Sequence, residues 1–390
     1  MVSIAKSAKE AGYKVYAADY FGDIDLRRVC SGCEAIIEQK RGKSCGRMES
    51  KFKTEAFLKM TKSLFQRCKI DAILLSSGLD DYFDVLYGLD ELAPILGNSP
   101  EVIERVRKKP GFFKELKRLG ITHPETEIVK NVDEAEAAAV EIGYPVVVKP
   151  IRGFGGLGIR TAQNSNEIER AFLEASLVGK DVIVQEFNKG VHASVSFLVA
   201  EKNVKILTIN EQMLGLRFLS QQEPFGYCGN IVPLHFANSI LESCRRITEK
   251  ISFHFGLKGS NGIDLVISED GTPYVMEVNP RFQGTLECVE RVLGMNLVKS
   301  HIYACLHDSL PTLKEKTSNF CTRLVLYAPE RIVAPDLTVF PEVRDVPLPG
   351  VIIEKREPLC SIITAGKNRE LSFQKAKKLA QLIYSMAHPA

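Results

Sequence analysis

The sequence lacks the features that mark membrane proteins and nucleic-acid-binding proteins. None of its apolar runs approaches the roughly 20 residues that are needed to cross a bilayer. Its 51 Lys and Arg residues nearly balance 48 Asp and Glu residues, and a net charge of +3 over 390 residues gives no electrostatic reason to bind nucleic acid or a membrane surface. Lysines interrupt the N-terminal stretch MVSIAKSAKEAGYK, so it is not a signal peptide. We therefore expect a soluble, cytoplasmic protein.

Motifs for the common forms of covalent and zinc catalysis are also missing. We find no GxSxG, HExxH or Cys-His signature. The chain has 10 cysteines, and Cys30 and Cys33 form a CxxC pair with Cys45 nearby. No second pair and no His-x3–5-His follows to complete a zinc site. The simplest interpretation is reduced thiols in a reducing compartment, and no role is assigned to Cys30 and Cys33.

The pattern of the sequence changes twice along its length, and 390 residues are too many for one hydrophobic core. Up to about residue 105, apolar strands alternate with amphipathic helices, which predicts an open parallel α/β sheet. Short strands and tight turns follow, which predicts an α+β domain. The last segment holds more short strands and one helix. We predict an N-terminal α/β domain at 1–105, a central domain at 106–314 and a small α+β subdomain at 315–390.

The N-terminal domain begins in an unusual way for a parallel α/β sheet. Ile4, Ala8 and Ala11 lie on one face of a predicted helix that Gly12 ends, and neither a strand nor a glycine turn precedes it. The first strand is therefore expected to be missing. We hypothesise that the natural protein starts upstream of Met1. Sequencing the intact protein's N-terminus from its source tests this idea, and a start at Met1 would end it.

One acidic hairpin carries the strongest chemical signal. GIDLVISEDGTPYVMEVNP contains Asp270-Gly271, which is typical of a two-residue hairpin turn. Centring the turn there places Asp264 directly opposite Glu277 at a non-hydrogen-bonded position, where side chains approach most closely. Two carboxylates in this arrangement repel each other and destabilise the sheet. The same register predicts an apolar opposite face made of Ile263, Leu265, Ile267, Tyr274, Met276 and Val278.

A hard divalent cation would turn this repulsion into binding. Asn279 lies two residues beyond Glu277 on the same face, and Gly262 opposite it leaves space. Carboxylate and amide oxygens together with phosphate are the ligands that Mg²⁺ prefers. Arg281 follows on that face with a fork suited to phosphate. The pattern predicts a metal–phosphate site, and the alternative is a solvated face whose acids lie apart in water.

The stretch GIDLVISEDGTPYVMEVNPRFQG resembles the metal-binding hairpin of the ATP-grasp superfamily. Within that superfamily, the order of motifs is most similar to predicted ATP-dependent carboxylate ligases related to biotin carboxylase. The resemblance covers roughly residues 105–310 and implies an ATP-grasp fold with ATP and Mg²⁺, or Mn²⁺, as cofactors. It implies that Asp264, Glu277 and Asn279 hold the metal and that Arg281 contacts the transferring phosphoryl group or the acyl phosphate.

The resemblance also implies two phosphate-binding lysines and a glycine-rich loop. PVVVKPIRGFGGLGIRTA provides Lys149, which would reach the α- or β-phosphate, and a loop whose backbone N–H groups can approach phosphate oxygens. The loop is neither a P-loop nor a dinucleotide fingerprint. Lys109 would be the second lysine, because its spacing to Gly120-Ile121 matches that of the family. The alternative is that Lys109, like most charges of the basic run RVRKKPGFFKELKR, is simply exposed to solvent. The loop glycines are Gly153, Gly155, Gly156 and Gly158.

VIVQEFNKG is similar to the family segment whose backbone reads the adenine edge, which implies that role for Gln185, Glu186 and Phe187. Many relatives carry a glutamate for the ribose hydroxyls shortly after this segment. This chain has Asn188 and Lys189 there, and His192 is the candidate for the ribose contact. A lone histidine at the start of a strand is more often structural.

The implied function is an ATP-dependent carboxylate–amine ligase with small-molecule substrates. Phosphorylating a carboxylate supplies the leaving group that an amine then displaces, and such a site needs positioning and charge neutralisation more than a nucleophile. Biotin-carboxylase chemistry is disfavoured, because Thr285 stands where that enzyme's catalytic glutamate would be. A small-molecule kinase and a non-catalytic ATP-binding regulatory module remain alternatives. We expect Gly284, Thr285 and the segment 223–234 to line the acceptor pocket, and we predict no particular oligomeric state.

Overall fold

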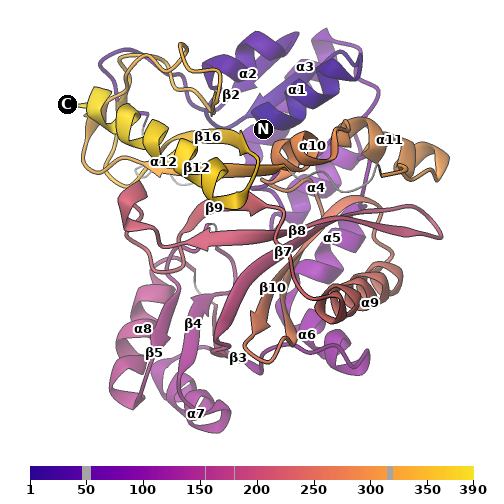
Figure 1. The fold of residues 1–390 in the computed structure, drawn as a ribbon, viewed down its shortest axis with the longest axis vertical. Coiled ribbons are helices and arrows are strands. Elements are labelled where there is room, and N and C mark those ends of the chain that lie inside the picture. The colour runs from indigo at the N-terminus through magenta and orange to yellow at the C-terminus, as the bar shows by residue number, and fades with distance from the viewer. Residues whose placement is uncertain (46–53, 154, 180, 314–318) are drawn as a thin grey trace.

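The computed structural model describes residues 1–45, 54–153, 155–179, 181–313 and 319–390. In Figure 1 the N-terminal helices lie at the top of the molecule, the long central sheet crosses the middle, and a small lobe built around β4 and β5 lies below it. Within the described part of the chain, no helix combines the length and the apolar character that a membrane crossing requires. The predicted combination of α/β and α+β regions is confirmed.

The N-terminal region is parallel, as its pattern predicted. Strands β1 and β2 pair in parallel, and a parallel bridge joins Ile73 to Ile95. The edge of β1 opposite β2 carries no paired strand in the described ranges. The elements are α1 (Val2–Glu10), β1 (Tyr16–Asp19), α2 (Ile24–Val29), β2 (Gly32–Ala35), α3 (Thr54–Arg67), α4 (Phe83–Asp90), α5 (Pro100–Arg107) and α6 (Lys109–Arg118).

The small lobe is a four-stranded antiparallel sheet in the order β3-β6-β4-β5, covered by two helices. Valines on the inner face of β4 and β6 pack with alanines of both helices in one hydrophobic cluster, and Figure 1 shows α7 and α8 beside this sheet. The elements are β3 (Thr126–Val129), α7 (Val132–Ile142), β4 (Val146–Pro150), β5 (Arg160–Ala162), α8 (Ile168–Ser176) and β6 (Val182–Glu186).

The central sheet has eight strands in the order β11-β10-β7-β8-β9-β12-β16-β14. Helix α9 packs on one face, where Phe112, Phe197 and Phe255 are fully buried. Its elements are β7 (Gly190–Val199), β8 (Val204–Leu214), β9 (Tyr227–Val232), α9 (Asn238–Phe255), β10 (Gly259–Ser268), β11 (Pro273–Asn279), α10 (Leu286–Leu293), α11 (Leu297–His307), β12 (Phe320–Tyr327), β14 (Val343–Arg344), β16 (Pro358–Gly366) and α12 (Arg369–Met386).

The C-terminal segment extends the central sheet and also forms a small sheet of its own. The predicted boundary between residues 314 and 315 lies outside the described residues. After it, β12, β16 and β14 continue the central sheet, and α12 packs on β12 and β16. A separate three-stranded sheet joins β13 (Ile332–Val333), β15 (Ile352–Ile353) and β17 (His388–Pro389). The last segment therefore lies beside β9 at one end of the central sheet, and residues of β12 and β16 line the cavity described below.

Candidate active site

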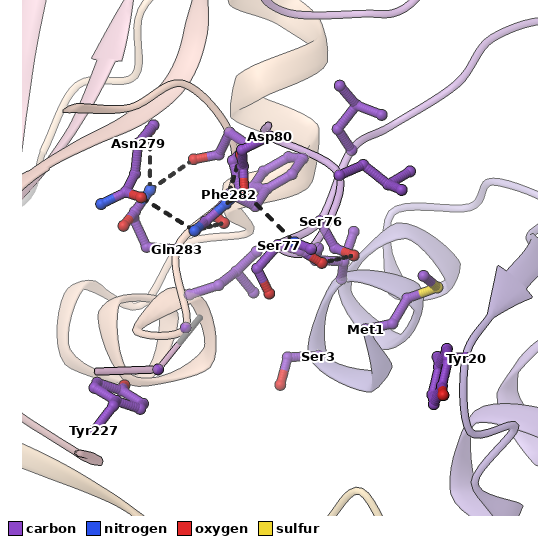
Figure 2. A pocket seen from close by; sticks show the side chains of 18 of the residues that line it. Met1, Ser3, Tyr20, Ser76, Ser77, Asp80, Tyr227, Asn279, Phe282 and Gln283 are labelled. Atoms are coloured by element: carbon purple, nitrogen blue, oxygen red, sulfur yellow. Dashed lines mark hydrogen bonds and ion pairs between the residues drawn. The ribbon is translucent and has the colours of Figure 1, made fainter. Parts of the chain in front are cut away.

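A cavity of about 2250 Å³ lies where the N-terminal region, the small lobe and the central sheet meet. Ligand pockets of about 300 to 1,000 Å³ are large enough for a drug-sized molecule, so this volume can hold a nucleotide and further substrates. Figure 2 shows Asp80 from the N-terminal region gathered with Asn279, Phe282 and Gln283 on one side of the cavity. The carboxyl end of β11 thus faces a loop that is distant in sequence.

The acidic hairpin pairs as predicted at its functional end. Asp264 lies opposite Glu277, and Gly262 lies opposite Asn279. The predicted two-residue turn is wrong, because Ser268 N–H donates to the Thr272 carbonyl at 3.0 Å and closes a three-residue loop. Gly271 has φ +85°, the left-handed conformation that such loops place at their last residue. A β-bulge between Asp264 and Leu265 restores the predicted register further along the strand.

The bulge also changes which residues face the core. Val275 and Val278 pack in the apolar cluster with Ile263, and Met276 lines the cavity next to Glu277. The predicted core positions of Tyr274 and Met276 are therefore wrong, since a one-residue shift moves side chains to the other face of a strand. The space that Gly262 leaves is filled by Gln283, whose Nε2 donates to the Asn279 and Arg281 carbonyls at 3.2 and 2.8 Å.

Asp264 is held by amides and not by cations. Its carboxylate accepts hydrogen bonds from Gln212 Nε2 at 2.8 Å and from Asn279 Nδ2 at 3.1 Å. Burial, together with the charge of Glu277, raises the pKa of Asp264 to about 6. Asn279 Oδ1 in turn accepts from Arg281 Nη2 at 3.1 Å. Asp264, Asn279 and Arg281 are therefore linked by hydrogen bonds, and Glu277 lies opposite Asp264 on the neighbouring strand.

Glu277 is surrounded by positive charge. Arg107 Nη1 and Lys109 Nζ donate to its two oxygens, each at 2.6 Å. Burial opposes ionisation of this carboxyl, but the charges of Arg107 and Lys109 outweigh it and hold the pKa of Glu277 well below its usual range. Lys109 is only 4% exposed and Arg107 8%, so the interpretation of this basic run as solvated charges is wrong for these two residues.

Two adjacent aspartates of the N-terminal region orient the arginines. Arg107 makes a bidentate pair with Asp81, with both distances 2.8 Å, and Arg281 Nε lies 3.1 and 3.2 Å from the oxygens of Asp80. The sequence interpretation missed Arg107, Asp80, Asp81 and Gln212. The two acids do carry a signal, because they follow the apolar run AILLSSG in a parallel α/β unit, where ligand sites form beyond the carboxyl ends of strands.

Lys149 and Gln185 lie on neighbouring strands β4 and β6 and both line the cavity. Lys149 Nζ donates to Gln185 Oε1 at 2.7 Å, and Gln185 Nε2 donates to Thr126 Oγ1 at 2.7 Å. Burial and the nearby charge of Lys109 lower the pKa of Lys149 to about 7. A buried lysine that is neutral takes up a proton when an anion binds next to its amino group, because the anion stabilises the charged form.

The sequence resemblance implies that the cavity binds ATP, and the pKa of Lys149 then predicts how the affinity for ATP depends on pH. Lys149 is charged below pH 7 and neutral above it, so the KM for ATP should rise as pH increases through about 7, with proton uptake on binding. Steady-state kinetics across this range, with calorimetry in buffers of different ionisation enthalpy, measure both effects. The variant Lys149→Arg stays charged and should have a flat profile. Equal slopes in the two proteins would contradict the assignment.

The glycine-rich loop is docked against the segment that precedes β9. Gly153, Gly155 and Gly156 line the cavity, and the Gly155 carbonyl accepts from Tyr227 N–H at 3.0 Å. Gly156 has φ +82°, and a Cβ there would lie 2.0 Å from the Phe225 carbonyl oxygen. Beside the loop, Arg160 pairs with Glu174 of the lobe and with Glu223 of this segment.

The predicted adenine segment contributes one side chain to the cavity. Gln185 lines it, whereas the side chains of Glu186 and Phe187 are not part of its wall in the described ranges. Glu186 N–H donates to the Glu125 carbonyl at 2.8 Å, and Phe187 N–H to the Pro145 carbonyl at 3.3 Å. The N–H groups of Glu186 and Phe187, which were expected to bind the adenine edge, are therefore already hydrogen-bonded to other backbone groups of the protein.

His192 and the cysteine pair differ in their relation to the cavity. His192 lines it, with its ring edge-on to Phe225 at 6.5 Å, and burial lowers its pKa. Cys30 and Cys33 are half-buried and not part of the cavity wall, and burial raises their pKa values to about 12 and about 11. In the described segments, no group of three or more His, Cys, Asp and Glu side chains is arranged to hold a metal.

The hairpin set fits a magnesium ion on its donor chemistry. It supplies two facing carboxylates and one amide, so only two of its three members are acids. Mg²⁺ binds proteins through one or two carboxylates and completes its octahedron with water and substrate phosphates. Burial and the charge of Glu277 raise the pKa of Asp264, so a cation bound beside this carboxyl would favour its ionised form.

The chain is similar to several known proteins. Residues 106–285 match a family model described as an ATP-grasp domain. An uncharacterized protein of Methanocaldococcus jannaschii is 25% identical over 364 residues, which cover 92% of this chain and 85% of that protein. The carbamoyl phosphate synthase large chain of Helicobacter pylori is 28% identical over 246 residues, which cover 61% of this chain and 22% of that protein. This chain therefore spans under a quarter of that relative.

A solved structure also shares the fold. The biotin carboxylase domain of 2-oxoglutarate carboxylase from Hydrogenobacter thermophilus, crystallised with MgADP, ADP and bicarbonate, has a TM-score of 0.76 to this chain. The match covers 99% of this chain and 87% of that chain at 19% sequence identity. The fold that the sequence motifs implied is therefore confirmed.

Proposed function

We propose that this chain, whose residues 106–285 match an ATP-grasp domain, is an ATP-dependent ligase that joins a carboxylate to an amine. The observation that carries the proposal is the charge arrangement around Glu277 and Asp264. These two acids face each other in a cavity whose wall also holds Arg107, Lys109, Lys149 and Arg281. Facing acids with surrounding cations suit a polyphosphate bound together with a divalent metal.

In the proposed reaction, an oxygen of the substrate carboxylate attacks the γ-phosphorus of ATP, and the bond to the β-phosphate oxygen breaks to release ADP. The amine then attacks the acyl carbon, the carbon–oxygen bond to phosphate breaks, and the leaving phosphate takes the amine's proton. The products are ADP, phosphate and an amide. A bound Mg²⁺, for which Asp264, Glu277 and Asn279 are the ligands, would neutralise phosphate charge.

The residues of the chain have distinct roles in this scheme. Lys149 and Lys109 bind phosphate oxygens, and Arg281, oriented by Asp80, binds the phosphoryl group that is transferred. Arg107 fixes the position of Glu277 and is itself held by Asp81. The glycine-rich loop forms part of the cavity wall, and its contacts with Tyr227 and Phe225 hold its backbone there for phosphate binding. His192 is the candidate for the ribose contact.

Biotin-carboxylase chemistry has less support than amide formation. The residue at the position of that enzyme's catalytic glutamate, Thr285, is buried, and its Oγ1 lies 3.0 Å from Ser196 Oγ. A threonine hydroxyl engaged in this way is not a general base. Gly284 lines the cavity, as do Tyr227 and Asn230 from the segment 223–234. These positions leave room for an acceptor next to Arg281.

A two-substrate screen tests the proposed function. The full-length protein is incubated with Mg-ATP and every combination from a panel of small acids and a panel of amines, and ADP and product masses are recorded. We expect ADP formation that requires both an acid and an amine, with a product equal in mass to their sum less water. A stable phosphorylated product from the acid alone would indicate a kinase. No stimulation by any pair would indicate a regulatory module.

A further inference from the structure

The cavity extends from the hairpin into the N-terminal region, where it borders two edges of the parallel sheet. Strand β1 and the segment 72–76 both line it, and Figure 2 shows Met1 and Ser77 around the same space. The segment 72–76 belongs to the sheet, because a parallel bridge joins Ile73 to Ile95. Within the described ranges, no strand pairs with β1 or with 72–76 on the side of this space. We call the space between these two edges the slot.

The backbone of β1 directs hydrogen-bonding groups into the slot. The Val15 carbonyl accepts from Ser31 N–H at 2.7 Å, on the side of β2. Successive residues of a strand direct their N–H and C=O groups to opposite sides, so those of Tyr16 and Ala18 point away from β2. An edge of this kind is a template for a further strand.

The opposite edge of the slot has the same character. Ile73 N–H donates to the Pro94 carbonyl at 3.0 Å, and the Ile73 carbonyl accepts from Leu96 N–H at 2.9 Å. Both backbone groups of Ile73 are thus used on one side. By the same alternation, the backbone groups of Ala72 and Leu74 point to the other side, toward the slot. One strand between the two edges could therefore pair with both.

The walls of the slot are apolar and incompletely buried. Helix α1 shares one hydrophobic cluster with Ala17 of β1 and another with Leu74, so it spans the slot from edge to edge. Ile73 and Leu74 are only half-buried, whereas the valines of β6 are fully buried. Inner strands of parallel sheets are normally buried on both faces. The apolar side chains of α1 and α3 that line the cavity here are Val2, Ala5, Ala8, Phe57, Leu64 and Phe65.

Helix α1 has the position of a crossover helix between the slot and β1. It leads through a short turn into β1, so helix and strand run in opposite directions and the start of α1 lies level with the carboxyl end of β1. A parallel strand in the slot would have its carboxyl end at this same level. A helix that connects parallel strands packs across both of them. The end of such a strand would therefore lie close to Met1, which lines the cavity.

We propose that the slot binds one further parallel strand, and that this strand is an apolar segment N-terminal to Met1 in the natural protein. It has about five residues, the usual length of a strand, and both of its faces are apolar because α1 and α3 cover them. Its turn into α1 closes the cavity wall near Asp80, which orients Arg281. This assignment is independent of the proposed ligase function.

An extended protein tests whether the slot accepts a strand. The full-length chain is produced with a segment before Met1 that consists of about five valine and isoleucine residues and a Gly-Gly turn. We expect the N–H groups of Ala18 and Leu74 to exchange with deuterium at least about tenfold more slowly than in the unextended protein, because each gains a hydrogen-bond partner. The melting temperature should rise by about 5 °C or more.

The matched control carries proline at the centre of the added segment. Proline has no N–H and is not tolerated in an inner strand, although the segment stays equally apolar. Exchange rates and melting temperature should then equal those of the unextended protein. Equal protection in both extended proteins, or protection in neither, would overturn the slot assignment. A melting temperature that rises with protein concentration would indicate pairing with a second copy and would overturn the intrachain strand.

The protein isolated from its natural source provides a test that does not depend on how an extended variant folds. N-terminal sequencing should find an apolar run of about five residues shortly before Met1, followed by a turn that contains glycine. A start at Met1, or a polar segment before it, would overturn the proposed occupant. Either result leaves the ligase function to be decided by the two-substrate screen.

Discussion

Replacing Asp264 with asparagine should reduce kcat by about a hundredfold or more while leaving the melting temperature unchanged or higher. The loss follows because the variant removes one of the two carboxylates on which the metal site depends, and charge stabilisation of the transferring phosphoryl group is the main catalytic contribution in such sites. Stability should not fall, because Asp264 is held by the amides of Gln212 and Asn279 and its charge is opposed by burial and by Glu277.

Glu277→Gln should reduce kcat to the same extent but should also destabilise the protein. The substitution leaves Arg107 and Lys109 facing a neutral amide, and breaking a buried ion pair in this way costs about 3 to 5 kcal/mol. Both variants should raise the Mg²⁺ concentration that is required for half-maximal rate. ADP formation across a magnesium titration and thermal unfolding measure these effects.

The cysteine pair supplies the control for these substitutions. Cys30 and Cys33 are not part of the cavity wall. The variants Cys30→Ser and Cys33→Ser should therefore leave kcat and the Mg²⁺ requirement nearly unchanged. Wild-type turnover in folded Glu277→Gln would contradict the metal assignment. A large loss in the cysteine variants would show that the measured effects are not specific to the hairpin.

Gly156→Ala is the second change with a large expected effect. The new Cβ would lie 2.0 Å from the Phe225 carbonyl oxygen and 2.5 Å from its carbon, and φ +82° is unfavourable for alanine. The loop must move off the segment before β9, which opens the cavity to water. We expect a rise of about tenfold or more in the KM for ATP together with a fall in kcat, because lid closure completes such sites.

Gly155→Ala is the matched control for that variant. Gly155 also has positive φ, at +62°, but a Cβ there meets nothing within 4 Å. Both variants carry the backbone strain, of order 1 kcal/mol, and only Gly156→Ala adds the collision with Phe225. Steady-state kinetics on the pair isolate the docking of the loop. Identical kinetic parameters for both variants would show that this contact has no part in ATP binding.

The acid pair was predictable from the sequence because its geometry is local. Asp264 and Glu277 lie on the two strands of one hairpin, and the alternation of polar and apolar residues restricts their register. The prediction succeeded although its turn was wrong, because the longer loop at Gly271 and the bulge after Asp264 offset each other. Met276 could not be placed correctly, since no residue pattern marks the position of the bulge.

The rest of the site depends on contacts between distant segments. Asp80 and Asp81 reach Arg281 and Arg107 only through the packing of the N-terminal region on the central sheet, which local patterns do not specify. Lys109 stood in a basic run, and its burial against Glu277 is a tertiary feature.

Isotope transfer tests the central claim, which is that the protein activates a carboxylate by phosphorylating it. The acid found in the screen is labelled with ¹⁸O in its carboxylate, turned over with Mg-ATP and the amine, and the released phosphate is analysed by mass spectrometry. If an acyl phosphate forms, one labelled oxygen from each carboxylate must leave in the phosphate. Phosphate without label, released together with a labelled amide product, would contradict the account.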